Sequence, residues 1–378
     1  MAVTPASAQS ADTLSDWLAL CQASGTGTAT IHRLLESFST PANALKASNG
    51  QLLQLGLKQT AIDALRKPEQ RSIARDLEWA EGADNHIITC HDQAYPPLLL
   101  EIPDPPPLLY VHGSVSLLSE PQLAMVGSRN PSSSGEQTAV DFARHLASAG
   151  LVITSGLALG IDAASHQGAL DVNAPTIAVM GTGLDRVYPA RHRDLARQIA
   201  GQGSLVSEFP IGTSPRPENF PQRNRIISGL SLGTLVIEAA IRSGSLISAR
   251  YAMEQGREVF AIPGSIHNPL ARGCHHLIRQ GAKLVETAED VIDELGSLAG
   301  ACTPPSATAQ ASTRPQQLGD EYLQLLDAIG FDPTSVDQLV ERSRLTPAEV
   351  SSMLLQLELS GYIASSPGGL YNRLKNKG

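Results

Sequence analysis

The spacing of apolar side chains predicts helices in the first fifth of the chain. Between residues 12 and 80 these side chains recur every three or four positions, which places them on one face of a helix. Three such stripes are formed by Leu14, Trp17, Leu18 and Leu20, by Ile31, Leu34, Leu35 and Phe38, and by Leu52, Leu53, Leu55 and Leu57. We therefore expect a helical module over residues 12–80.

The turns of this module leave two interpretations open. Gly25-Thr26-Gly27 separates the first two stripes, and Thr40-Pro41 follows the second. A glycine-rich turn between short helices is typical of helix-hairpin-helix and SAM-like modules, which hold a DNA backbone through helix N-terminal amides. A plain helical bundle that makes contacts within the protein has the same pattern. The proline-dense stretch from Tyr95 to Pro107 is expected to pack as an extended arm.

Short β-branched runs alternate with amphipathic segments from residue 122 to about 295. Such alternation is typical of βαβ units and a mainly parallel sheet. The sequence therefore predicts an α/β core over residues 90–296, with an extended Rossmann-like, doubly wound sheet. The expected strands are Leu123–Val126, Leu151–Thr154, Thr176–Met180, Ser204–Ser207, Thr234–Ile237, Glu258–Ile262 and Lys283–Val285. The expected helices include Gly135–Ala149, His192–Gly201, Ser245–Gln255 and Ala288–Leu295.

The chain ends in a linker and a small third domain. Residues 297–320 are rich in Ala, Ser, Thr, Pro and Gln and lack periodicity, which indicates a flexible linker. Residues 321–378 predict a winged helix, with two helices joined by a turn and then a hairpin turned by glycines. Its expected recognition helix, Ala348–Ser360, carries Glu349 and Glu358 and no basic residue. This favours contact with a protein over reading of a DNA groove.

Composition and charge narrow the class of protein. The formal net charge of −9 argues against nucleic-acid binding, because Lys and Arg must neutralise phosphates. Residues 216–257, however, hold six arginines and three acids, a local balance of +3. Four scattered cysteines without a CxxC pair predict a reduced, cytoplasmic protein without a structural metal. No secretory-type N-terminus or run of 18 apolar residues is present, so no membrane span is expected.

Small residues follow most of the expected strands. In a doubly wound sheet these loops gather at one rim, where ligands bind. Glycine lets backbone amides approach an anion closely, and helix N-termini add a favourable dipole. The pattern therefore predicts a phosphate-binding surface formed by Gly127, Ser128, Ser155, Gly156, Gly160, Gly181, Gly183, Ser243, Gly244 and Ser245.

Aromatic and basic side chains complete the expected site. Phe220 offers a ring on which an unpaired base could stack, although core packing explains it equally well. Arg223 and Arg225 suit phosphate contacts, or one of them a buried salt bridge. Asn224 could bond a base edge or cap the following helix. Arg129, at the tip of the first loop, is expected to contact DNA.

Several enzyme classes lack their signatures in this sequence. Gly127-Ser128-Arg129 does not provide the GxGxxG of a dinucleotide site, and neither a Walker A motif nor a GxSxG elbow occurs. Asp162 and His166 are four residues apart, but no nucleophile is specified near them, so we interpret them as scaffold or binding groups. We expect no enzymatic activity, no catalytic residue and no cofactor.

The ordered set of loops resembles the DprA/Smf family from about residue 90 to 295. The residues that carry the resemblance are Gly127-Ser128-Arg129, Ser155 to Asp162, Gly181-Thr182-Gly183-Leu184-Asp185, Tyr188-Pro189, Ser207-Glu208, Phe220 to Ile227, Glu238-Ala239 and Ser243-Gly244-Ser245. Each motif is weak alone, and their order and spacing are specific. The helical N-terminal module and the winged-helix tail also resemble the variable appendages of that family.

This resemblance implies a homodimeric core that binds single-stranded DNA. It further implies loading of RecA recombinase onto DNA protected by single-strand-binding protein, in natural transformation. Arg129 would match a DNA-contacting arginine of the family. The sequence departs from the family after the Tyr-Pro pair, where Ala190 stands at a basic position, so that role passes to Arg191. Glu238 and the Ser243-Gly244-Ser245 loop resemble the phosphate site of related nucleotide-handling proteins.

Two alternatives from other classes remain. The first is a nucleotide-binding or nucleoside-monophosphate-hydrolysing enzyme of the lysine-decarboxylase-like group, which resembles this chain around Gly233-Thr234 to Glu238. Those enzymes carry a Pro-Gly-Gly-x-Gly-Thr run, whereas the stretch here is Gly229-Leu230-Ser231-Leu232-Gly233-Thr234. The second alternative is a chromosome-associated regulator that binds duplex DNA through its winged helix.

Overall fold

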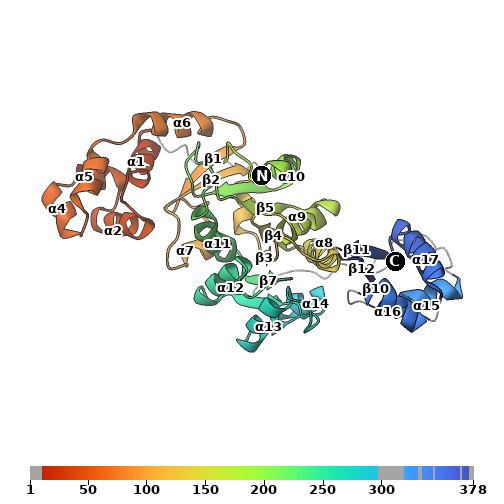
Figure 1. Cartoon of the computed structure of the whole chain (residues 1–378). Helices are drawn as coiled ribbons and strands as arrows, with labels where there is room; N and C mark the ends of the chain where they lie inside the picture. The colour runs from red at the N-terminus through yellow and green to blue at the C-terminus, as the bar shows by residue number, and fades with distance from the viewer. Residues whose placement is uncertain (1–10, 297–318, 331–333, 344, 367, 374–378) are drawn as a thin grey trace.

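The chain forms three parts that follow one another in space as in sequence. The structure, a computed structural model, describes residues 11–296, 319–330, 334–343, 345–366 and 368–373. A helical module lies at one end, an α/β core in the middle and a small helical domain with a hairpin at the other end (Figure 1). Among the described residues, no helix is long and apolar enough to cross a membrane.

The core is built on a nine-stranded sheet of order β1-β2-β6-β5-β4-β3-β7-β8-β9. Its strands are β1 (Asn85–Thr89), β2 (Leu108–Gly113), β3 (Gln122–Val126), β4 (Val152–Ser155), β5 (Thr176–Val179), β6 (Ser204–Ser207), β7 (Gly233–Val236), β8 (Glu258–Ala261) and β9 (Lys283–Leu284). In this spatial order, every neighbouring pair from β6 through β5, β4, β3, β7 and β8 to β9 is parallel. Strand β2 pairs antiparallel with both β1 and β6. The order reverses at β3, and its C-terminal end is therefore the switch point at which such sheets bind ligands.

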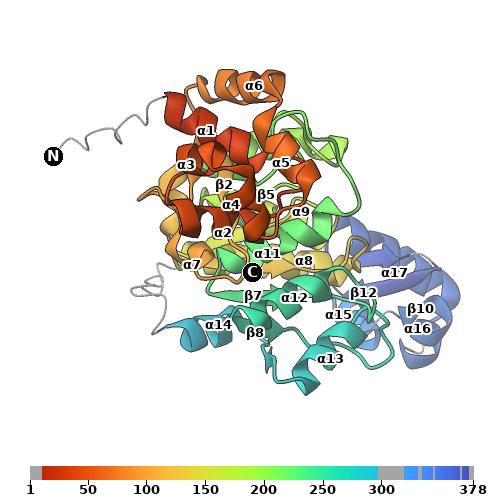
Figure 2. The ribbon, with the colours of Figure 1, turned by 90° about the vertical axis from the view of Figure 1, so that its left-hand side faces the viewer.

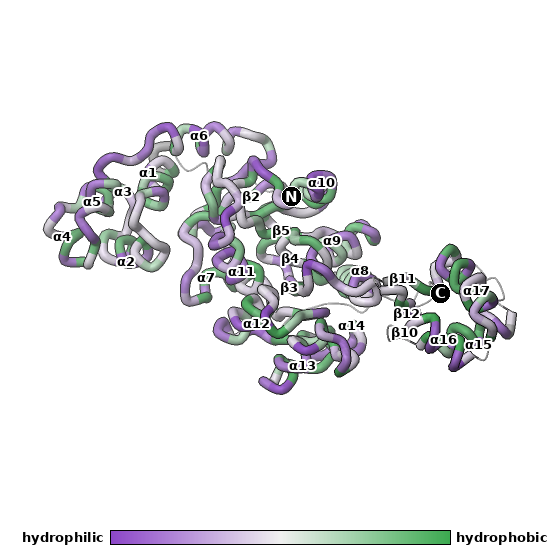
Figure 3. The backbone as a smooth tube through the Cα atoms, in the orientation of Figure 1, coloured by the Kyte–Doolittle hydropathy of each residue, from purple (hydrophilic) through white to green (hydrophobic). Residues whose placement is uncertain are grey.

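Helices cover both faces of this sheet. On β3, Leu123 and Met125 pack toward α8, while Ala124 and Val126 belong to the cluster that includes α11 and α12. Burial on both faces explains the nearly continuous apolar runs of the strands, which form the hydrophobic centre of the molecule in Figure 3. The core helices are α7 (Pro97–Leu100), α8 (Ser133–Ser148), α9 (Ile161–Asp171), α10 (Arg193–Gln202), α11 (Asn219–Gly229), α12 (Ser245–Glu254), α13 (Arg272–Arg279) and α14 (Ala288–Leu295), with 3₁₀ turns η1 (Val115–Ser119) and η2 (Ala190–His192).

The structure confirms the doubly wound core and all seven expected strands, with ends that shift by at most one residue. Two features differ from the expectation. The antiparallel strands β1 and β2 extend the sheet beyond the parallel part, and they were not predicted because they lie before the strand–helix alternation begins. The expected extended arm contains one helical turn, α7, where Leu99 is buried.

The N-terminal module is helical, as expected. Its helices are α1 (Ala11–Cys21), α2 (Thr28–Phe38), α3 (Pro41–Lys46), α4 (Asn49–Gln54), α5 (Gln59–Arg66) and α6 (Gln70–Ala80). Buried Asp76 joins module and core, because it accepts hydrogen bonds from Gln22, from the Tyr110 hydroxyl and from the Ile211 amide. Figure 2, which views the molecule from the side of this module, shows α1 to α6 covering one end of the sheet.

The C-terminal domain has the topology of a winged helix. It contains α15 (Asp320–Ile329), β10 (Thr334–Ser335), α16 (Val336–Ser343), α17 (Pro347–Leu359), β11 (Ile363–Ser366) and β12 (Leu370–Arg373). The hairpin β11–β12 lies against α8 of the core (Figure 1). On α17, Leu355 and Leu359 are exposed. Apart from residues 319 and 320, the expected linker 297–320 lies outside the described residues.

Candidate nucleic-acid interface

A cavity of about 550 Å³ opens at the C-terminal edge of the sheet, beside the switch point. Loops that follow several strands contribute to it, together with the N-terminal parts of α11 and α12. Eight of the residues predicted for the site line this cavity. They are Gly127, Arg129, Phe220, Arg223, Asn224, Ser243, Gly244 and Ser245.

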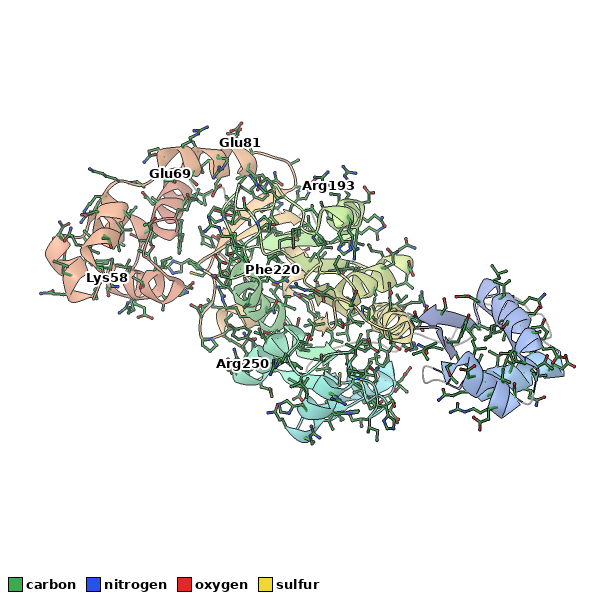
Figure 4. The ribbon with its side chains drawn as sticks, viewed as in Figure 1. Lys58, Glu69, Glu81, Arg193, Phe220 and Arg250 are labelled. Carbon is green, nitrogen blue, oxygen red and sulfur yellow. The ribbon has the colours of Figure 1, made fainter. Side chains whose placement is uncertain are left out.

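An aromatic and cationic cluster stands at the cavity wall. The Arg129 guanidinium carbon lies 5.8 Å from the centroid of the Phe220 ring, within the range of a cation–π contact. The Tyr188 and Phe220 ring centroids are 5.4 Å apart and inclined by 44°. Arg129 is exposed, Tyr188 is 48% exposed, and Phe220 is partly buried. Phe220 lies at the start of α11, near the centre of Figure 4.

Arg223 lies beneath this cluster as a structural cation. It is 3% exposed, and its Nη1 donates to the carbonyl oxygens of Gly156 and Val179. Burial, which Asp162 opposes and Arg129 reinforces, lowers the pKa of Arg223 from 12.5 to about 10. Because this guanidinium is hydrogen-bonded to the end of β5 and to the loop after β4, it holds the cavity wall together and has little surface left for a phosphate.

Arg225 points to the opposite side of α11. Its side chain is 5% exposed and pairs with Glu208, whose side chain is 7% exposed. It also donates to the Asp104 carbonyl oxygen at 2.6 Å. Burial raises the pKa of Glu208 to about 7, although Arg225 opposes this shift. The expected phosphate contact of Arg225 is thus corrected, because this arginine is the buried salt-bridge partner that the sequence left open as an alternative.

The loop from Ser155 to Asp162 already holds an anion of its own. The amides of Gly156 and Ala158 donate to Asp162 Oδ2 at 3.1 and 3.2 Å. A Cβ atom on Gly156 would overlap the Arg223 guanidinium, so glycine is needed here for close packing. The amide of Gly156 therefore serves an internal carboxylate, contrary to the expectation that it faces a phosphate.

A second internal carboxylate occupies the N-terminus of α8. Glu238 accepts hydrogen bonds from the Ser132 amide at 2.8 Å and the Ser132 hydroxyl at 2.6 Å. A Cβ atom on Gly135 would overlap this carboxyl group. The sequence suggested that Glu238 belongs to a phosphate site, but in the structure it fills the position where a phosphate would meet the helix dipole.

The other predicted residues lie beside the cavity or beneath it. Arg191 is exposed in η2. Gly160 approaches the Ser128 carbonyl oxygen and Pro131, with φ +75°, and so supports the first loop. Four further predicted residues are buried and do not line the cavity: Ser128, Ser155, Gly181 and Gly183.

Sequence reasoning missed three exposed side chains of this region. Tyr188 was noted only as part of the Tyr-Pro pair, although it lines the cavity. Arg216 and Arg242 are exposed and directly precede the lining residues Pro217 and Ser243. Within the part of the chain that the structure describes, the side chain of neither arginine forms an ion pair or a hydrogen bond. The local charge balance between residues 216 and 257 was the signal that could have singled them out.

The described residues contain no cluster of three or more His, Cys, Asp or Glu side chains that could hold a metal ion. His166 is completely buried, and its Nδ1 lies 2.7 Å from the Thr176 hydroxyl. That hydroxyl donates to the Ile153 carbonyl oxygen, so His166 Nδ1 is the donor of this pair. Burial lowers the pKa of His166 to about 3. The side chain belongs to the scaffold, as the sequence indicated.

Fold and site together define a Rossmann-like protein with an open, arginine-rimmed cavity at its switch point. Comparison with protein families makes this specific. The family of DNA recombination-mediator protein A matches residues 86–296, and the DprA winged helix domain matches residues 308–369. The chain therefore belongs to the DNA recombination-mediator protein A family, also named DprA or Smf.

Individual relatives agree with this assignment. Protein Smf of Escherichia coli is 46% identical over 327 residues, which cover 86% of this chain and 87% of that protein. The DNA processing protein DprA of Streptococcus pneumoniae is 49% identical over 203 residues, 54% of this chain and 72% of that protein.

Solved structures show the same fold. The crystal structure of DprA from Streptococcus pneumoniae has a TM-score of 0.68 at 38% identity and covers 75% of this chain and 98% of its own. DNA processing protein A from Helicobacter pylori, described for its single-stranded DNA binding mode, has a TM-score of 0.51 at 30% identity and covers 56% of this chain and 96% of its own.

Proposed function

We propose that this protein binds single-stranded DNA at the arginine-rimmed cavity and acts as a recombination mediator. The observation that carries the proposal is the combination of the Tyr188–Phe220 ring pair with exposed, unpaired arginines at one rim. Aromatic rings stack bases of any sequence, and a cationic groove holds the backbone. The binding mode described for the Helicobacter pylori relative supports this proposal.

Exposed arginines, rather than backbone amides, supply the phosphate contacts in this proposal. Asp162 and Glu238 already accept the hydrogen bonds that two of the loops offer, so a compact nucleotide phosphate finds no free amide cradle there. Arg129, Arg216 and Arg242 are spread around the cavity. Such an arrangement suits an extended polyanion better than a mononucleotide. This argues against the nucleotide-hydrolysing alternative and for a function without turnover.

The test is binding of fluorescent oligo-dT against a duplex of equal length at several salt concentrations. Single-strand affinity should fall by about 0.7 log units per log unit of salt for each phosphate that an arginine neutralises. Arg129→Ala, Arg216→Ala and Arg242→Ala should each reduce that slope by about 0.7. Arg71→Ala, an exposed arginine on α6, is the matched control. Equal affinity for duplex, or slopes unchanged in all three variants, would contradict the proposal.

The proposal extends to partners by way of the family. A cytoplasmic mediator of this kind would act as a homodimer and load RecA recombinase onto DNA covered by single-strand-binding protein, in natural transformation. The sheet ends at the two-residue strand β9, whose Lys283 and Leu284 are both exposed, so we take the apolar side chain of Leu284, 45% exposed, as the candidate contact with a second copy.

These partner roles have their own measurements. Leu284→Lys should shift the mass in solution from dimer to monomer, and an unchanged mass would exclude this edge as the interface. The protein should also accelerate RecA filament formation on single-strand-binding-protein-coated DNA, and Arg129→Ala should lose this effect. A nucleotide panel incubated with the protein should release no free base.

A further inference from the structure

A second cavity, of about 210 Å³, lies between the N-terminal module and the core, and we call it the junction cavity. Its walls come from the end of α1, the start of α2, the start of β2 and the loop after β6, with Gln222 from α11. It shares no lining residue with the cavity at the C-terminal edge of the sheet. We infer that the junction cavity binds a small apolar α-amino acid in its zwitterionic form, a function that does not depend on the DNA site.

Two residues that line this cavity each have a buried oxygen atom without a hydrogen-bond partner among the described residues. Gln22 donates its Nε2 to Asp76 Oδ2 at 2.6 Å, and its Oε1 is left unpaired. Glu208, whose side chain is 7% exposed, accepts from Arg225 through Oε2, while its Oε1 is unpaired. The Gln222 side chain lies near the same carboxyl group, whose pKa burial raises and Gln222 lowers, but it forms no hydrogen bond with Oε1. A buried acceptor without a donor costs free energy, so an occupant that donates to both oxygens would be stabilised here.

The N-terminus of α2 offers hydrogen-bond donors at the same cavity. Gly27 is the N-cap of this helix, so no side chain caps it, and its first turn contains no acidic residue. The amides of Thr30 and Ile31 donate to the Gly27 carbonyl oxygen, whereas the amides of Thr28 and Ala29 have no acceptor among the described residues. Both Gly27 and Thr28 line the junction cavity. Free amides at the positive end of a helix dipole favour a carboxylate.

These two halves of the cavity define the ligand. An α-amino acid carries an ammonium group with three N–H donors and, one carbon away, a carboxylate that only accepts. The ammonium group suits the unpaired oxygens of Gln22 and Glu208, and the carboxylate suits the α2 amides. The cavity has the volume of roughly seven water molecules, so the side chain must be small, and Ile31, Leu108 and Phe209 in the wall favour an apolar one. A DNA backbone fits less well, because the Glu208 carboxyl group would face its phosphates.

The experiment titrates the full chain with L-alanine and L-valine and follows Tm, with isothermal titration calorimetry as the direct measure of binding. Tm should rise with ligand concentration as expected for a ligand that binds only the folded state, and the heat of binding should saturate. Two analogues at the same concentration each remove one end of the zwitterion. L-Alanine methyl ester lacks the carboxylate, and N-acetyl-L-alanine lacks the ammonium group, so both should bind more weakly than L-alanine.

Matched variants locate the site. Thr28→Pro removes one donor amide at the first position of α2, where proline is well tolerated, and should weaken L-alanine binding roughly 10- to 100-fold, the effect of losing a hydrogen bond to a charged group. Gln22→Met removes the oxygen acceptor at the other end and should also weaken it. Gln59→Pro makes the same change at the first position of α5, which likewise has no side-chain cap and does not line the cavity, so it should bind like the wild type. Each shift is measured from the variant's own Tm without ligand.

Several results would overturn the inference. The first is the absence of saturable binding of L-alanine and L-valine, which leaves the proposed DNA function untouched. The second is equal weakening by Thr28→Pro and Gln59→Pro, because the effect would then not come from the junction cavity. The third is equal binding of L-alanine and its methyl ester, since α2 would then hold no carboxylate. If Thr28→Pro instead loses affinity for oligo-dT while L-alanine does not bind, the N-terminus of α2 contacts DNA and the amino-acid site is excluded.

Discussion

Replacing Arg225 by alanine tests the distinction between a structural and a DNA-binding arginine. Both side chains of the Arg225–Glu208 pair are more than nine-tenths buried, and Arg225 also bonds the Asp104 carbonyl oxygen. Removing one partner of such a pair leaves a buried charge without compensation, which costs about 3–5 kcal/mol of stability. For a unit of about 200 residues this lowers Tm by roughly 6–20 °C.

The loss should depend on pH with a defined sign. The pKa of Glu208 is raised from 4.5 to about 7 in the folded protein. Between these pH values the folded state holds a proton that the unfolded state has lost, so this group's contribution to stability falls as pH rises and levels off above about 7. Arg225 opposes the rise in pKa, and its removal extends the decline above pH 7. Arg225→Ala should therefore be more damaging at pH 8 than at pH 6.

Thermal or urea unfolding at the two pH values measures this effect. Arg129→Ala is the exposed control and should keep the wild-type Tm while it weakens oligo-dT binding. Adding Glu208→Gln to Arg225→Ala should restore part of the stability at pH 8, because no buried carboxylate remains to be charged. The reasoning is refuted if Arg225→Ala unfolds like the wild type yet loses DNA affinity, since Arg225 would then act on DNA directly.

Two other predictions concern the scaffold. Gly135→Ala should destabilise the protein by about 1–3 kcal/mol in urea unfolding, because the added Cβ would overlap the hydrogen-bonded Glu238 carboxyl group. The control Gly201→Ala, where the added Cβ meets open space, should be neutral or stabilising, and equal effects of the two changes would contradict this. The pKa of buried His166 is lowered from 6.5 to about 3, so the wild type should lose stability as pH falls between these values. The variant His166→Gln should lose less stability over the same range, and parallel plots of unfolding free energy against pH for the two proteins would exclude this contribution of His166.

Much of the fold could be read from local patterns. The strands from β3 to β9 and helices such as α14 follow from periodicity alone, because each alternation of apolar runs and small-residue loops is a local property. The rim position of the loops followed from the parallel sheet, since all its strands end at one edge. The antiparallel strands β1 and β2 escaped prediction because they precede the strand–helix alternation, and only the fold shows that β2 pairs with the distant strand β6.

The candidate site likewise has one part that the sequence predicts and another that only the fold decides. The sequence determined by itself which residue types gather at the rim, including Arg129 and Phe220, because their loops follow successive strands. Only the tertiary structure decided which arginine side chains remain exposed and able to contact DNA. Arg223 and Arg225 are two positions apart on α11. Arg223 is hydrogen-bonded to the backbone of the cavity wall, whereas Arg225 pairs with Glu208 from the loop after β6. Burial and charge pairing depend on groups from distant segments, and spacing along one helix cannot reveal them.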